Sequence, residues 1–297
     1  MNGGRPKLLT TDQPFLTDLD INPMKTLKAL FDFYLDASIH VALSVLAMAG
    51  VTFHLFDTFS DLDLLGFIFF SVIVCYNFIK YGVEAYKYII VSNAYHKTIQ
   101  LFSFASFGGA LYFLVQLDAQ IWWGTLILGF LSALYAVPLL PRAKNLRNLA
   151  GLKIYIVAFV WAGFTVLLPL LDAGLPLNWD FWIAFVQRFL LVLVLILPFE
   201  IRDLQWDDKS LRTLPQVLGI KSTQRLGVVL TVLFFSLTFL KDDIHPLEIG
   251  LRLLLALVLI TVLLANKKMQ TRYFVSFWVE AIPIFWFLLF WGIERYV

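Results

Sequence analysis

Residues 187–219 read QRFLLVLVLILPFEIRDLQWDDKSLRTLPQVLG, an apolar run that is followed at once by a charged segment. The run up to residue 199 is too apolar to face water. The segment 200–219 then gathers seven charged side chains: Glu200, Arg202, Asp203, Asp207, Asp208, Lys209 and Arg212. This boundary is typical of a membrane-spanning helix that ends at a polar surface.

The composition of the whole chain supports a membrane protein. Of its 297 residues, 60% are hydrophobic and only 15% are charged, whereas soluble domains have roughly half apolar and about a quarter charged residues. Nine apolar runs are long enough to be candidate spans, and they do not alternate as spanning strands would. They lie near 38–57, 64–82, 99–117, 121–140, 150–171, 181–199, 226–240, 248–265 and 273–293. The sequence therefore predicts an all-α, polytopic integral membrane protein.

The positive charges predict the orientation. All but four of the 23 Lys and Arg residues lie before the first run or in the connections after the second, fourth, sixth and eighth runs. Because inner segments are rich in Lys and Arg, we expect a cytoplasmic N-terminus and a C-terminus on the outer side, in a plasma or inner membrane. The net charge of +2 reflects this bias and does not indicate a nucleic-acid partner.

The N-terminal part of the chain is predicted to form a segment separate from the transmembrane domain. Residues 22–38, NPMKTLKALFDFYLDAS, predict a short helix at the membrane interface, with Asn22 as its cap and Pro23 in its first turn. Its expected apolar face consists of Leu27, Leu30, Phe31 and Tyr34. We therefore expect a cytoplasmic segment over 1–37 and a transmembrane domain over 38–297.

Two inner connections, those after the second and the sixth runs, are longer than the others. The one after the sixth run carries paired carboxylates. Asp203 and Asp207 are four residues apart, so they share one face of a helical extension of the preceding span. Such a pair suits Mg²⁺, which takes one or two carboxylates and completes its shell with water and phosphate oxygens. Lys209 and Arg212 would supply phosphate donors. The alternative is a solvated loop whose charges only enforce the topology.

The same segment resembles a known motif. IRDLQWD followed by RTLPQVLG is similar to the second aspartate-rich motif of the UbiA superfamily of intramembrane aromatic prenyltransferases. ALYAVPLLPRAKNLRNLAGLK, residues 133–153, resembles the segment that ends the fourth helix in that family. The spacing from Asp207 to Thr213 is one residue shorter than in the family and lacks its Gly, although Asp208 adds a carboxylate.

The resemblance implies nine helices around a central cavity that opens at the inner face. There, a metal-bound isoprenoid diphosphate, or a related lipid, would give its prenyl group to an aromatic or other lipophilic acceptor. Asp203 and Asp207 are the implied catalytic and metal-binding residues. The implied substrate-binding residues are Asn77, Lys80, Lys209, Arg212, Tyr135 and Lys153.

The first aspartate motif of the family is degenerate in this chain. Residues 75–88 read CYNFIKYGVEAYKY, in which Asn77 matches the family but Phe78, Tyr81 and Ala85 replace three aspartates. We therefore expect at most one Mg²⁺. Lys80 would either neutralise the diphosphate directly or pair with one of the two aspartates and close the metal site.

These two accounts of Lys80 leave two functions open. One is a prenyltransferase; the other is a non-catalytic protein of the same fold that binds a lipid or a partner in the same cavity. A transporter ranks third, since paired inverted repeats with broken helices are not evident.

Further polar residues lie within the spans. Glu280 and Arg188 would either line the cavity or pair with each other. His40 and His54 are expected to be packing or hydrogen-bonding residues.

Overall fold

The computed structural model is helical throughout its described part. It describes residues 23–59, 61–85, 93–136, 151–207, 211–265, 271 and 273–295. The first half contains α1 (Pro23–Asp36), α2 (Ile39–Leu55), α3 (Leu62–Ala85), α4 (Ala94–Leu114), α5 (Ala119–Ala136), α6 (Lys153–Ala162), a π-helical segment (Gly163–Leu167) and α7 (Leu168–Asp172). The second half contains α8 (Trp179–Asp203), α9 (Leu214–Leu218), α10 (Ile220–Ser236), a 3₁₀ turn (Leu237–Leu240), α11 (Glu248–Leu264), a second π-helical segment (Phe274–Val279) and α12 (Glu280–Glu294).

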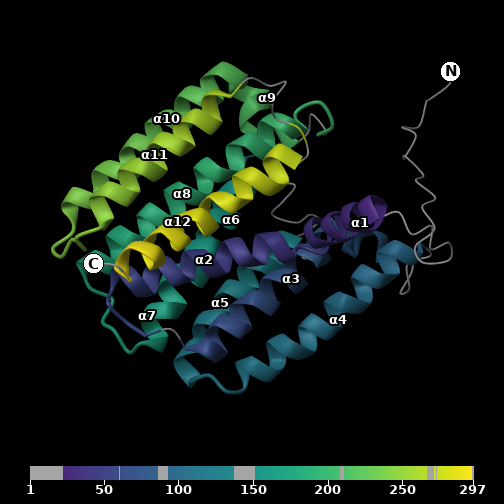
Figure 1. The fold of residues 1–297 in the computed structure, drawn as a ribbon, viewed down its shortest axis with the longest axis horizontal. Helices are drawn as coiled ribbons and strands as arrows, with labels where there is room; N and C mark the ends of the chain where they lie inside the picture. The colour runs from purple at the N-terminus through teal and green to yellow at the C-terminus, as the bar shows by residue number, and fades with distance from the viewer. Residues whose placement is uncertain are drawn as a thin grey trace.

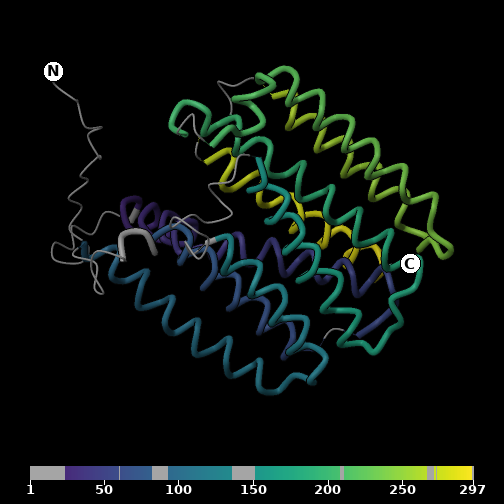
Figure 2. Tube along the Cα trace, turned by 180° about the vertical axis from the view of Figure 1, so that it is seen from behind, coloured from purple at the N-terminus to yellow at the C-terminus, as the bar shows by residue number. Residues whose placement is uncertain are grey.

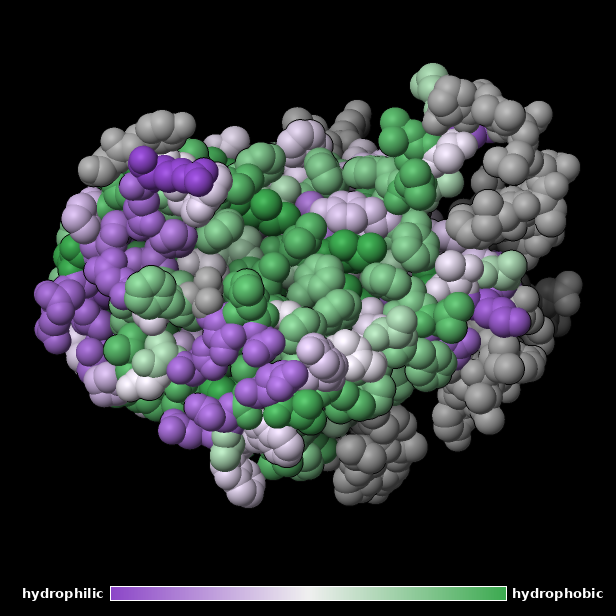
Figure 3. Space-filling view, turned by 60° about the horizontal axis from the view of Figure 1, so that its bottom comes forward, coloured by the Kyte–Doolittle hydropathy of each residue, from purple (hydrophilic) through white to green (hydrophobic). Residues whose placement is uncertain are grey.

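The prediction of an all-helical membrane protein is confirmed, but the count of nine spans is not. Each expected apolar run overlaps a helix. Five helical stretches are long and apolar enough to cross a membrane, and the bent pair α1–α2 would make a sixth. Figure 3 shows the corresponding surface, in which hydrophobic residues cover the middle and hydrophilic residues gather toward one end.

The helices form two groups around a shared centre. In Figure 1, α3, α4 and α5 lie on one side and α10 and α11 on the other, with α2, α6, α8 and α12 between them; Figure 2 shows the same arrangement from behind. One hydrophobic cluster surrounds α8 and a second surrounds α2 and α3, and Trp161 packs against both. Trp161 therefore connects the hydrophobic cores of the two groups.

The predicted N-terminal helix is present as α1, but its apolar face is divided. The Phe31 ring makes an edge-to-face contact with the Phe277 ring, and the Tyr34 hydroxyl lies 2.6 Å from His40 Nδ1, so these two residues hold α1 to the bundle. Leu27 and Leu30 are 69% and 62% exposed. This exposure suits a helix at the membrane interface. Residues 1–22 lie outside the described residues, and the domain boundary at 37–38 stays a prediction.

Two helices are interrupted by π-helical segments, and α2 supplies donors to both. Pro169 has no N–H, so it cannot donate to the Thr165 carbonyl four residues earlier. The Thr52 hydroxyl donates to that carbonyl instead, at 2.5 Å. In the second segment, His40 Nε2 donates to the Phe277 carbonyl at 2.9 Å. Backbone groups that leave the regular helical pattern inside the bundle thus receive side-chain partners from α2.

Arg188 belongs to this same set of contacts. Its guanidinium donates to the Met48 carbonyl at 2.6 Å and to the Thr52 hydroxyl at 3.1 Å, and it lies 5.7 Å from the centre of the Trp286 ring. The suggested pairing of Arg188 with Glu280 is therefore wrong, because Arg188 is engaged by α2.

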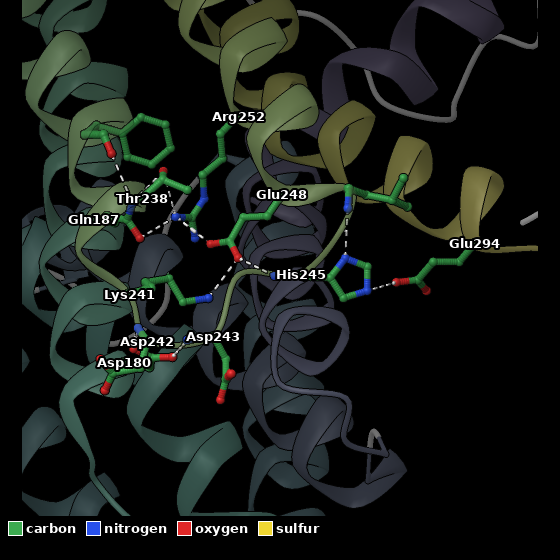
Figure 4. Close-up of polar contacts among 12 residues, drawn as sticks. Asp180, Gln187, Thr238, Lys241, Asp242, Asp243, His245, Glu248, Arg252 and Glu294 are labelled. Atoms are coloured by element: carbon green, nitrogen blue, oxygen red, sulfur yellow. Dashed lines mark hydrogen bonds and ion pairs between the residues drawn. The ribbon is translucent and has the colours of Figure 1, made fainter.

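A buried charge network fixes α8, α10 and α11 at the end of the molecule that carries residues 241–248 (Figure 4). Glu248 lies between two cations, with its carboxylate 2.8 Å from Lys241 Nζ and 2.6 Å from Arg252 Nη1. The same Arg252 nitrogen donates to Gln187 and to Thr238. The side chains of the three ionic residues are almost fully buried.

This network could not be predicted from the sequence. Lys241 directly follows the apolar run 226–240 and Arg252 lies within the run 248–265, and neither position predicts that a single carboxylate, Glu248, joins them. At the same end, Asp180 accepts hydrogen bonds from the backbone N–H groups of Asp242 and Asp243. These bonds hold the 241–248 connection against α8.

Replacing Glu248 by Ala should strongly destabilise the protein. The substitution leaves Lys241 and Arg252 buried without a counter-charge, which typically costs about 3–5 kcal/mol. Thermal unfolding of the purified protein in detergent, followed by circular dichroism, measures the loss. The exposed Asp243, changed to Asn, is the matched control and should unfold like the original chain; an equal effect of both substitutions would contradict the assigned role of Glu248.

Candidate functional site

The C-terminal ends of α3 and α8 lie at the same end of the molecule. Figure 1 places the α1 and α9 regions, which adjoin these ends, on the side away from the C-terminus. Lys80 of α3 and Arg202 of α8 both act electrostatically on Glu280 of α12. The three helices therefore converge, as expected from the two long connections that follow the second and sixth spans.

The paired aspartates share one helical face. Regular helix α8 ends at Asp203, but the Asp207 N–H still donates to the Asp203 carbonyl at 2.9 Å, which adds one more turn. Both Asp203 carboxylate oxygens accept hydrogen bonds from Arg202, at 2.7 and 2.9 Å. One carboxylate oxygen of Asp207, Oδ2, is buried and has no hydrogen-bond partner among the described residues.

A second ion pair lies beside these aspartates. Lys153 Nζ is 2.7 Å from Glu200 Oε1, and the Glu200 side chain is only 3% exposed. The charge of Asp207 acts on both of them, and Tyr135, which is buried, acts on Lys153. The predicted residues Tyr135, Lys153 and Asp207 are therefore brought together.

Glu200 was missed as a member of this site. It precedes Asp203 by three residues and Asp207 by seven, a spacing that places all three on one helix face. That spacing was the available signal. Glu200 is held by Lys153, so its carboxylate is already neutralised.

The motif that follows Asp207 forms a short turn of helix. Thr213 and Gln216 make a reciprocal capping box at the start of α9, with Pro215 in the first turn. Gly219 has φ 77°, a left-handed conformation that glycine adopts without strain, and it lets α10 begin directly after α9. Arg212 is exposed, while Lys209 lies outside the described residues.

At the end of α3, Asn77 serves the framework. Its side chain is buried and donates to the Ala37 carbonyl at 3.1 Å and to Ser103 Oγ at 2.9 Å. Its carbonyl oxygen accepts from Ser38 Oγ at 2.8 Å. Ser38 has φ 62° at the bend between α1 and α2. Asn77 thus joins this bend to α3 and α4.

The neighbouring residues of α3 hold α1 in place. Lys80 Nζ donates to the Leu35 carbonyl at 3.3 Å, and the Tyr81 hydroxyl donates to the Asp36 carbonyl at 3.2 Å. The Tyr95 hydroxyl donates to the Asp36 carboxylate at 3.0 Å. Burial and the nearby Asp36 charge raise the pKa of Tyr95, so its hydroxyl keeps the proton that it donates.

The residues present fit one Mg²⁺ better than two. The unpartnered Asp207 oxygen is a suitable ligand atom, and a magnesium ion needs only one or two carboxylates. Phe78 and Tyr81 offer no carboxylate from α3. In the described part of the chain, no group of three or more His, Cys, Asp or Glu residues is arranged to hold a metal.

A small cavity of about 120 Å³ lies among α2, α3, α6, α8 and α12. Its walls are mostly apolar, and its polar side chains are Ser44, Tyr76, Trp161 and Glu280. The Trp161 indole N–H donates to the Tyr76 hydroxyl at 2.9 Å. The suggestion that Glu280 lines a cavity is confirmed.

The two histidines of α2 make contacts of the expected kind. The contacts of His40 were described above, and His54 Nδ1 lies 2.5 Å from Glu294 Oε2. His54, His245 and Glu294 line a second hollow, of about 380 Å³, at the end that carries the buried charge network. This hollow is remote from the aspartates and is not part of the candidate site.

The fold matches solved structures of known proteins. A UbiA homologue from Archaeoglobus fulgidus bound to GPP and Mg²⁺ aligns with a TM-score of 0.57 and 14% identity, covering 88% of this chain and 98% of that one. The homologue bound to DMAPP and Mg²⁺ gives a TM-score of 0.53 and 14% identity, covering 86% and 98%. No family model and no curated protein matches the sequence. The predicted resemblance is therefore confirmed at the level of the fold.

Replacing Asn77 by Ala should lower stability. The change leaves Ser38, Ser103 and the Ala37 carbonyl without this partner, and one unsatisfied buried group costs about 1–3 kcal/mol. Thermal unfolding in detergent measures the effect. Thr261, an exposed residue whose hydroxyl bonds only within its own helix, gives the control substitution Thr261→Ala. Unchanged stability of the Asn77 variant would show that its hydrogen bonds do not support the bend.

Proposed function

We propose that this chain, which has the fold of the UbiA homologues, is a member of that superfamily. In this proposal it binds an isoprenoid diphosphate at the end where α3 and α8 converge and transfers the prenyl group to a lipophilic acceptor. The Archaeoglobus homologues are described as bound to GPP or DMAPP with Mg²⁺. The observation that carries the proposal here is the buried, unpartnered carboxylate oxygen of Asp207 on the same helical face as Asp203.

Asp207 and Asp203 are the residues that would hold one Mg²⁺. When bound, the ion would neutralise the leaving diphosphate. Asp207 offers a free oxygen, whereas Asp203 must exchange its contact with Arg202 for the ion. The released guanidinium is then available to a phosphate oxygen, for which its planar fork is well suited.

The other cations expected at this end are also assigned roles. Lys80 lies on α3, where the family's first motif would supply carboxylates, and Arg212 is exposed beyond Asp207. We assign Lys80, Arg212 and Lys209 to the diphosphate, and Lys153 to positioning Glu200 beside it. Asn77 is assigned to the framework, since its amide is occupied by Ser38, Ala37 and Ser103.

The cavity walls suit an allylic cation. Tyr76, Trp161 and Phe199 present aromatic side chains to the cavity. Aromatic faces stabilise a positive charge within about 6 Å, and more strongly where water is excluded. Tyr135 is buried near Lys153 and would close the site on that side.

The second candidate function is lipid binding without catalysis. The observation that favours it is the Arg202–Asp203 pair, which engages both Asp203 oxygens and would keep the metal out if it does not open. In both functions we propose that the aspartate end faces the cytoplasm, following the distribution of Lys and Arg.

Replacing Asp207 by Asn should weaken Mg²⁺-dependent binding of geranyl diphosphate by at least about tenfold. The carboxylate charge is the part of the side chain that the metal needs. Isothermal titration of the purified protein, with and without Mg²⁺, measures the change, and release of diphosphate reports turnover. Asp118→Asn alters an exposed carboxylate in the turn between α4 and α5 and should bind normally. If the original chain binds geranyl diphosphate equally well without Mg²⁺, the metal role of Asp207 is wrong.

Replacing Lys80 by Ala distinguishes the two accounts of this residue. Asp203 is paired with Arg202, so we expect Lys80 to act on substrate rather than on the aspartates. Loss of a charge-assisted hydrogen bond should then weaken diphosphate binding by about 1.5–3 kcal/mol. Stronger Mg²⁺ binding by the Lys80→Ala variant, measured in the same titration, would instead support a closed, non-catalytic site.

A further inference from the structure

We propose that the first half of α1 binds the anionic head groups of phospholipids in the surrounding bilayer through Lys25 and Lys28. The binding surface, called the α1 surface below, consists of these two lysines and the exposed side chains of Leu27 and Leu30. This interaction does not depend on the prenyl transfer proposed above, because it can be measured without Mg²⁺ or diphosphate.

The second half of α1 is fixed to both groups of helices. On one side the Tyr273 hydroxyl, just before the second π-helical segment, donates to the Asp32 carboxylate at 2.8 Å. On the other side the Phe33 ring makes an edge-to-face contact with the Phe102 ring of α4, at 5.8 Å between ring centres. Helix α3 holds the last turn of α1 by the hydrogen bonds described above. These contacts determine the direction in which the first half of the helix projects.

The first half of α1 extends away from these contacts. In Figure 1, α1 continues outward from the end of α2, and residues 24–30 are all exposed. Leu27 and Leu30 lie on the same side of the helix as Phe31 and Tyr34, because helical residues three and four apart are neighbours. The apolar side that packs against the bundle in the second half is therefore exposed in the first half.

The two lysines have no anionic partner in the described protein. Lys25 and Lys28 are three residues apart, so they lie close together on the helix, and residues 23–31 contain no Asp or Glu. Asp32 lies four residues after Lys28 and could pair with it, but its carboxylate accepts a hydrogen bond from Tyr273. Neither lysine makes a hydrogen bond or ion pair with a described residue. Two positive charges are thus exposed beside apolar side chains.

An anionic membrane surface fits both parts of this pattern. The chain of α1 bends by 56° into the helix α2 that follows it, so α1 lies beside the apolar helices where they would leave the bilayer. Exposed leucines can enter the boundary between head groups and acyl chains, while lysine stems reach out to the phosphates. A soluble acidic partner would not need the leucines, and a second copy of this surface would bring lysines against lysines.

The test uses the full chain with one fluorescent label on α1. Thr26→Cys in a Cys75→Ala background carries an environment-sensitive dye and leaves all four residues of the α1 surface in place. The protein in detergent is titrated with phosphatidylglycerol or with phosphatidylcholine. We expect phosphatidylglycerol to bind at least about tenfold more tightly at low salt, since each lysine near an anionic surface contributes about fivefold. High salt should reduce this preference, because it screens exposed charges.

Replacing Lys25 and Lys28 together by Gln should bring phosphatidylglycerol binding down to the level of phosphatidylcholine. Both lysines are exposed, so the variant should unfold at the same temperature as the original chain. Lys97→Gln removes an exposed lysine of α4 and is the matched control, which should keep the preference. Leu27→Ser should weaken both lipids alike, because an apolar contact does not respond to the charge of the head group.

Three outcomes would overturn the proposal. They are equal affinity for the two lipids, a phosphatidylglycerol preference that survives the double lysine substitution, and an equal loss of preference in the Lys97→Gln control. A label signal that follows protein concentration rather than lipid would show instead that α1 packs against a second copy of the chain, and would equally contradict it.

Discussion

The fold depends on satisfying backbone groups where helices leave their regular hydrogen-bond pattern inside an apolar bundle. Water is scarce inside the bundle, so each backbone carbonyl that has lost its helical donor needs another donor from the protein. Thr52 and His40 of α2 provide donors to the Thr165 and Phe277 carbonyls, and Arg188 donates to α2 in turn. Helix α2 is therefore a source of polar contacts for its neighbours as well as a packing element. These contacts permit the irregular segments that border the cavity.

The two ends of the bundle use charge in different ways. At one end Glu248 forms ion pairs with two buried cations, and Asp180 holds the connection between α10 and α11. Glu248 Oε1 and Arg252 Nε have no hydrogen-bond partner among the described residues, but both groups take part in ion pairs. At the other end the carboxylate of Asp207 is only partly satisfied, and Asp203 is held by its own neighbour Arg202. The candidate site differs from the structural network in its ion pairing, because Glu248 contacts two cations whereas Asp207 forms no ion pair with the described residues.

Much of the fold and part of the site could be predicted from the sequence. Apolar runs locate the helices, because hydrophobic length is a local property, and the spacing of Asp203 and Asp207 correctly placed them on one face. The motif match carried the fold assignment, which the structural comparison confirms at 14% identity. The number of spans could not be predicted in the same way, because length and composition allow five or six and a helix such as α5 is shorter than these.

The contacts between distant residues could not be predicted in this way. Lys153 meets Glu200, and Arg188 meets α2 rather than Glu280, because packing brings together residues far apart in the chain. Asn77 matched a family position, yet its amide is occupied by structural hydrogen bonds. A sequence pattern identifies a polar residue but does not show which partner satisfies it.

The bond from Thr52 to the Thr165 carbonyl has a consequence for how such chains diverge. While Pro169 is present, a donor at position 52 is useful; once the proline is lost, an ordinary helical N–H can serve the same carbonyl. Selection therefore acts on positions 52 and 169 together, although they belong to different helices and neither reaches the aspartates. Among relatives, these two positions should change in concert while the aspartate motif stays the same.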